Sequence, residues 1–241
     1  MIKFPRVGLA ALLLLSLVAG RGDAYELNGR ISSDFYSYQS ADQDHLRPYL
    51  RFNGNLLAWE SADGRSLRIH SSVRWTSDFS DQLRTDPQLL VRDLYVHLAQ
   101  VIPRSDLYLG RQFVYNGAGS ALIDGGRVRI RPVRAITLDF FGGSSVSSED
   151  PETVRSLDDN LVVGARLGAR PDRASRLGLN WMWRRRDGQT SLSRIGLNAD
   201  RRLGRAEAFG RVAYNAADLR LAEILGRAMY RALNGPLPVH S

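Results

Sequence analysis

The sequence has no cysteine, a single lysine, and no apolar run beyond its first residues that could form a helix across a membrane. Without cysteine the chain can form neither a disulfide nor a thiolate site. The one lysine is Lys3, so every other cationic side chain is an arginine, which stays protonated at any working pH. These absences exclude a disulfide-stapled domain and a helical membrane protein, and they leave strand pairing as the source of stability.

The longest apolar run lies at the start of the chain. Two cationic residues precede an apolar segment over residues 7–20, and Gly22-Asp23-Ala24 forms a small-x-small motif. This order is typical of a secretory signal peptide, and the run is shorter than the ~20 residues that a transmembrane helix needs. We therefore expect residues 1–24 to be a signal peptide that is cleaved after Ala24. Its removal takes away three cationic residues and one anionic residue, so the formal charge falls from +8 to +6.

A regular alternation of apolar and polar residues appears in the stretch 105–132. Its second half alternates two apolar side chains with three arginines, in the order Arg127, Val128, Arg129, Ile130 and Arg131. A period of two is that of a β-strand whose faces meet different environments. The arginine face needs a wide aqueous space, and the other face needs an apolar one. A membrane-spanning β-barrel with a watery lumen supplies both.

The same alternation predicts nine further strands, at residues 25–35, 47–59, 65–76, 90–101, 135–142, 160–170, 175–186, 190–202 and 205–215. Short connections alternate with mostly longer polar ones, such as 37–46 and 114–126, as in outer-membrane barrels. A soluble β-sandwich is the alternative, but strands of ten or more residues exceed the usual soluble length. We predict an all-β fold, an antiparallel transmembrane β-barrel with about 11–12 strands over residues 25–217.

The C-terminal segment, residues 218–241, departs from this pattern. Its apolar side chains recur at helical spacing and Gly235-Pro236 follows as a helix stop, which predicts a helix. A weaker alternation through Ala222, Ile224 and Gly226 predicts a twelfth strand instead. Eleven strands do not make an ordinary even-numbered bacterial barrel, so the segment is expected to be a helix, a twelfth strand or the end of a truncated barrel.

Polar positions of the predicted strands are rich in arginine. The residues expected to line the pore are Arg127, Arg129, Arg131, Arg166, Arg176, Arg184, Asp93 and His97. A wall of one dominant sign concentrates the opposite ion, so we expect a pore for small anionic solutes or a polyanionic polymer. The competing interpretation is a structural ladder in which acids such as Asp93 and Asp139 neutralise the arginines.

Two histidines in the polar phase raise the alternative of an enzyme. His70 and His97 share a face with Asp93, and a hydrolase of lipid or surface substrates would need a nucleophile such as Ser71 or Ser72 beside them. The sequence contains no GxSxG elbow. A polar lumen explains the histidines without catalysis, so we expect a channel and not an enzyme.

The charge pattern also indicates which kinds of partner the protein binds. Arginines recur at alternate strand positions and do not cluster in a helix or arm, so we expect no nucleic acid. Acidic residues between positions 149 and 159 lack EF-hand spacing, so no metal site is expected. The expected partners are membrane lipid and an anionic solute or polysaccharide, and an oligomer is compatible with the pattern.

Three short motifs follow one another in the stretch 105–132, namely Leu109-Gly110-Arg111-Gln112, Tyr115-Asn116-Gly117 and Ile123-Asp124-Gly125. This combination resembles outer-membrane porins and alginate-export-like barrels. The resemblance implies passive or facilitated passage through a lumen in the Gram-negative outer membrane, with no cofactor. Because Arg111 falls in the apolar phase, we expect it near a rim, or turned inward by a bulge at Gly110. The motif either sets strand register or takes part in a constriction.

Overall fold

The computed structural model describes residues 26–40, 43–77, 88–147 and 156–230. Its strands are β1 (Glu26–Ser40), β2 (Gln43–Glu60), β3 (Ser66–Thr76), β4 (Gln88–Ala99), β5 (Ser105–Tyr115), β6 (Ser120–Val133), β7 (Ile136–Ser145), β8 (Leu161–Ala169), β9 (Ser175–Arg186), β10 (Gln189–Leu203), β11 (Ala206–Asn215) and β12 (Arg220–Tyr230). A single helical turn, α2 (Leu157–Asn160), precedes β8. No helix of the described residues is long and apolar enough to cross a membrane. The predicted signal peptide, 1–24, lies outside the described residues.

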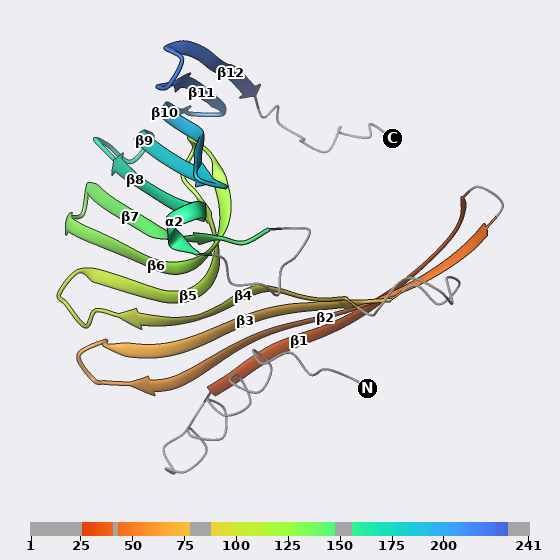
Figure 1. The fold of residues 1–241 in the computed structure, drawn as a ribbon. Helices are drawn as coiled ribbons and strands as arrows, with labels where there is room; N and C mark the ends of the chain where they lie inside the picture. Colours follow the sequence, from red (N-terminus) through yellow and green to blue (C-terminus); the bar gives the residue numbers. More distant parts are fainter. Residues whose placement is uncertain (1–25, 41–42, 78–87, 148–155, 231–241) are drawn as a thin grey trace, which may run out of the picture.

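The twelve strands form one antiparallel sheet in which each strand pairs with its neighbours in sequence. The order runs from β1 to β12, and in the described part of the chain no pairing joins these two edge strands. Figure 1 shows the sheet curving, with β1 and β12 at its opposite ends. Strands arranged in this up-and-down order make the wall of a β-barrel. The predicted all-β, antiparallel fold is confirmed.

The two faces of the sheet differ in chemistry, as β9 illustrates. Leu177, Leu179 and Trp181 are 49%, 45% and 40% exposed, whereas Asn180 and Met182 are 1% and 0% exposed. We call the face with Leu179 the outer face and the face with Asn180 the inner face. Because successive strand residues point to opposite sides, the alternation in the sequence becomes an apolar outer face and a mostly polar inner face, on which apolar residues such as Met182 are buried.

The first two strands are longer than predicted. Residues 37–46, expected to be a polar loop, mostly continue the β1–β2 ladder, which projects beyond the rest of the sheet in Figure 1. Cross-strand contacts accompany this extension. The rings of Tyr36 and Tyr49 meet edge to face at 5.2 Å, and the guanidinium of Arg47 lies 5.4 Å from the centre of the Tyr38 ring. Such pairs stabilise a ladder whose polar composition resembles a loop.

The C-terminal segment is a strand, so the helical alternative is wrong for Arg220–Tyr230. This strand, β12, pairs antiparallel with β11 along its whole length. Ile224 is 69% exposed on the outer face, as the weaker alternation predicted. A helix in this segment would leave the edge of β11 unpaired. A strand instead supplies the ladder hydrogen bonds that β11 needs.

The hairpin of β5 and β6 separates from β4 and its end folds over the inner face, while β6 stays paired with β7 as far as Ile123. The pairing of β4 with β5 extends no further than Arg111, and beyond it the hairpin runs inside the curve of the sheet (Figure 1). Gly110 has a φ of +125°, and a Cβ there would lie 2.4 Å from the carbonyl oxygen of Leu94. On β6, a Cβ at Gly125 would lie 2.1 Å from the carbonyl oxygen of Gly142. Only glycine permits backbones to approach this closely.

The end of this hairpin forms the buried apolar core with the wall. The cluster consists of Val114, Ala118, Ala121 and Ile123 from the hairpin and of Phe141, Val162 and Met182 from β7, β8 and β9. Full burial of an aliphatic side chain of this size contributes roughly 1.5–3 kcal/mol. The segment 114–126, expected to be a polar loop, is therefore mostly strand and is anchored inside the curve.

Candidate functional site

Arginines line the inner face of β6, and carboxylates of the neighbouring strands hold them. Asp139 of β7 accepts hydrogen bonds from Nε and Nη2 of both Arg127 and Arg129. Asp106 of β5 pairs with Arg131 at 2.7 Å. Three guanidinium groups thus share two carboxylates, as in the neutralised ladder that was the competing interpretation. One positive charge of this group remains uncompensated.

Four aromatic rings continue this wall across β3, β4 and β5. His97 stacks on Tyr108 with ring centres 4.4 Å apart, and His70 stacks on Tyr95 at 4.8 Å. The guanidinium of Arg127 lies 5.6 Å from the centre of the Tyr108 ring. Stacking and cation–π contacts restrict these side chains, so the wall beside the arginines is polar and ordered.

The other arginines predicted to line the pore are spread over β8 and β9. Arg166 is exposed on β8. On β9, Arg176 lies 3.9 Å from Asp200, and the Nε of Arg184 donates a hydrogen bond to the hydroxyl of Ser191. Arg166 lies opposite Asp139 in the β7–β8 ladder, next to the arginines of β6, whereas Arg176 and Arg184 lie further along the sheet on β9.

The hydrolase alternative needs a serine beside a histidine, and no such hydrogen bond forms among the described residues. The hydroxyl of Ser72 donates to Oδ1 of Asn53 at 2.8 Å, while Ser71 lies in the outer-face phase of β3. Asp93 accepts a hydrogen bond from a backbone N–H of β5 where that strand leaves β4. His97 has a carboxylate of β5 as its neighbour, at 3.6 Å. Ser72 and Asp93 are thus engaged by contacts inside the sheet, and among the described residues no serine hydroxyl is hydrogen-bonded to His70 or His97.

The motif that resembles porins forms the base of the inward hairpin. Arg111 donates two hydrogen bonds of 2.7 Å to the carboxylate of Asp124, and its side chain is only 8% exposed. Gln112 is buried, and Gly110 and Gly125 lie at the bend. Arg111 is therefore neutralised across the hairpin by Asp124, its register partner, and the ladders through Gly110 show no bulge.

Asparagines that no sequence pattern singled out for this role anchor the end of the hairpin. The side-chain amide of Asn116 donates to the carbonyl oxygen of Trp181 at 2.7 Å, and its oxygen accepts from the N–H of Ala118 at 3.1 Å. Asn180 donates to Oδ1 of Asn198 at 2.8 Å. The Asn-Gly pair at 116–117 signals a turn in the sequence. Nothing in the sequence shows which strands that turn reaches.

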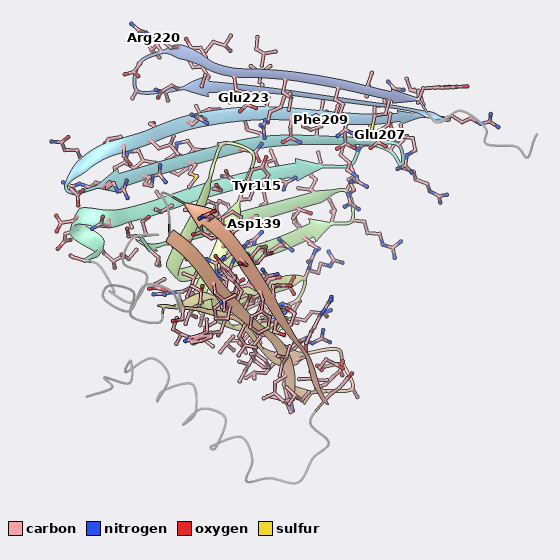
Figure 2. The ribbon with its side chains drawn as sticks, turned by 90° about the vertical axis from the view of Figure 1, so that its right-hand side faces the viewer. Tyr115, Asp139, Glu207, Phe209, Arg220 and Glu223 are labelled. Carbon is pink, nitrogen blue, oxygen red and sulfur yellow. The ribbon has the colours of Figure 1, made fainter. Side chains whose placement is uncertain are left out.

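A second anchor, also not indicated by any sequence pattern, joins the hairpin to β11. The hydroxyl of Tyr115 accepts a hydrogen bond from Arg211, whose guanidinium also pairs with Glu223 of β12. Tyr115 and Glu223 are labelled in Figure 2, which shows the sheet with its side chains. The hairpin thus connects the middle of the sheet to its last two strands.

Together, the fold and this inner face define a class of protein, an up-and-down antiparallel β-wall with an apolar outer face, a polar inner face and a hairpin folded against the inner face. No protein-family model matches the sequence, and a comparison with curated proteins finds no match.

Among solved structures, the chain is similar to two engineered variants of the porin of Rhodobacter blastica. One variant gives 14% identity and a TM-score of 0.31, and the other gives 13% and 0.32. Each alignment covers 80% of this chain and 85% of the porin. Likeness at this level transfers neither function nor residue roles to this chain.

Proposed function

We propose that this protein is a channel of the Gram-negative outer membrane that passes small anionic solutes along the inner face of its sheet. The observation that carries the proposal is the division of one long-stranded sheet into an apolar outer face and an arginine-bearing inner face. Lipid matches the first face, and a water-filled passage matches the second. The inward hairpin would narrow that passage beside β7 to β11.

The preference for anions rests on an excess of positive charge on the inner face. Its arginines include Arg51, Arg68, Arg74, Arg127, Arg129, Arg131, Arg166, Arg176, Arg184, Arg194 and Arg211. Its carboxylates include Glu26, Asp34, Asp93, Asp106, Asp139, Asp200, Glu207 and Glu223. A fixed excess of one sign concentrates the opposite ion. The same excess would suit a polyanionic polymer.

The test is the reversal potential of the purified protein in a planar bilayer across a potassium chloride gradient. We expect a preference for chloride. Replacing Arg127, Arg129 and Arg131 together by glutamine should shift the preference towards potassium, because Asp106 and Asp139 then lose their counter-charges.

A matched control is the triple replacement of Arg65, Arg173 and Arg205 by glutamine. These three arginines are exposed in turns between strands, so the variant loses the same formal charge away from the inner face. It should keep the reversal potential of the unmodified protein. Potassium preference in the unmodified protein, or no conductance at all, would contradict the proposal.

A further inference from the structure

Two arginines face each other directly across β2 and β3 on the inner face. Arg51 and Arg74 are register partners in the antiparallel ladder. Directly opposite side chains on one face have Cβ atoms about 4.5–5.5 Å apart, and like charges in this arrangement destabilise the sheet. A counter-charge between the two guanidinium groups would therefore stabilise this part of the sheet.

No described carboxylate supplies that counter-charge within ion-pairing distance of either arginine. On the inner face nearby, Asp34 lies on β1 without a close ion pair to Arg51, and Asp93 on β4 is engaged by a backbone N–H of β5. The residues next to the pair, Asn53 and Ser72, are neutral and hydrogen-bond each other. This contrasts with β6, where carboxylates hold the arginines.

The donor geometry of Arg74 points to a missing acceptor. Its Nε is buried from solvent and has no hydrogen-bond partner among the described residues. Its guanidinium carbon lies 5.9 Å from the centre of the Tyr49 ring, which helps to hold the group in place. The Arg74 side chain is half-buried and Arg51 is exposed, so an anion from the aqueous passage can reach both guanidinium groups and supply the acceptor that this Nε lacks.

We propose that Arg51 and Arg74 form a binding site for a tetrahedral dianion, such as phosphate or sulfate, on the inner face. Two opposed guanidinium groups carry two positive charges, which one dianion neutralises and one chloride does not. The paired N–H donors of a guanidinium group also match the spacing of the oxygens in such oxyanions. The site refines the proposed function by naming the class of anion that is held there. It rests on that function, because the anion reaches the site from the aqueous passage.

Thermal unfolding of the full-length protein in detergent tests the site. Phosphate should raise the Tm by about 2–4 °C over chloride at equal ionic strength, because a ligand that binds the folded state stabilises it. Sulfate should act in the same way, and acetate should not. Arg74→Gln should raise the Tm in chloride, since it removes the repulsion, and should abolish the phosphate shift.

Two further variants complete the design. Arg51→Glu should pair with Arg74, so it should raise the Tm in chloride and remove the response to phosphate. Arg176→Gln, on the inner face but far along the sheet on β9, should keep the response. A lower Tm in chloride for both Arg51→Glu and Arg74→Gln, or an unchanged phosphate shift in either, overturns the site.

Conductance separates this site from the proposed function. A chloride-selective pore with no phosphate-dependent Tm shift overturns the site and leaves the function standing. A protein that shows the shift, loses it in Arg74→Gln and does not conduct supports the site and overturns the function.

Discussion

The environment of a single side chain in this sheet depends on its face and on whether the inward hairpin covers it. Leu179 and Asn180 are adjacent on β9, yet the apolar side chain is 45% exposed and the polar one is 1% exposed. This inverts the arrangement of a water-soluble sheet, in which exposed positions are mostly polar. The proposed membrane location would account for the inversion, because lipid would then be the solvent of the outer face.

Leu179→Arg should therefore destabilise the protein by about 2–4 kcal/mol, the cost of placing an arginine on a lipid face near mid-membrane. Asn28→Arg, at an exposed inner-face position of β1, is the matched control and should cost little. Refolding titrations in lipid vesicles measure both. Equal costs for the two variants would show that the outer face does not meet lipid.

A second prediction at this scale concerns Asp139, which holds both Arg127 and Arg129. Asp139→Asn leaves the two guanidinium groups without a counter-charge, so the stability should fall by roughly 1–3 kcal/mol. The same change should increase the preference for chloride. Reversal potentials and unfolding titrations of one preparation check both effects, and a decreased chloride preference would show that this part of the wall does not face the ions.

Among the structural elements, the inward hairpin changes the sequence-based expectations most. The alternation assigns Asn180 to a watery lumen, where an arginine would be tolerated. The structure instead buries Asn180 beside Gly117, with a hydrogen bond to Asn198. That expectation is therefore wrong, and Asn180→Arg should disrupt the anchor of the hairpin.

The bend of the hairpin leads to a test with two glycines. Gly125→Ala places a Cβ within 2.1 Å of a neighbouring carbonyl oxygen, whereas a Cβ at Gly210 on β11 meets nothing within 4 Å. The first substitution should cost several kcal/mol or prevent folding, since backbone must move, and the second should change stability by less than about 1 kcal/mol. Heat-induced unfolding followed by circular dichroism compares them, and similar stabilities would exclude a tight bend at Gly125.

At the scale of the whole molecule, the outer edges of β1 and β12 matter most, because neither pairs with a further strand among the described residues. An open edge exposes N–H and C=O groups that lipid cannot satisfy, so strands in a bilayer must pair on both sides. Pairing at these edges is required if the chain is to conduct as a barrel. The conductance test under the proposed function therefore also tests closure.

The predicted export signal gives one further test at this scale. Expressed in a Gram-negative host, the mature chain should begin at Tyr25 and fractionate with the outer membrane. N-terminal sequencing and density-gradient fractionation check this. Recovery as a soluble periplasmic monomer would contradict a membrane location.

The sequence by itself determined eleven of the strands, though not all of their bounds, and the chemistry of the two faces. Strand alternation is local, with a period of two, so Leu177 and Asn180 could be assigned to faces without knowing their neighbours. Non-local contacts were decided only by the tertiary structure. The pairing of β12 with β11, the anchoring of Asn116 on Trp181, and the sharing of Asp139 by two arginines depend on which strands become neighbours. These contacts join segments that are far apart along the chain, so no local pattern in a single sequence shows them.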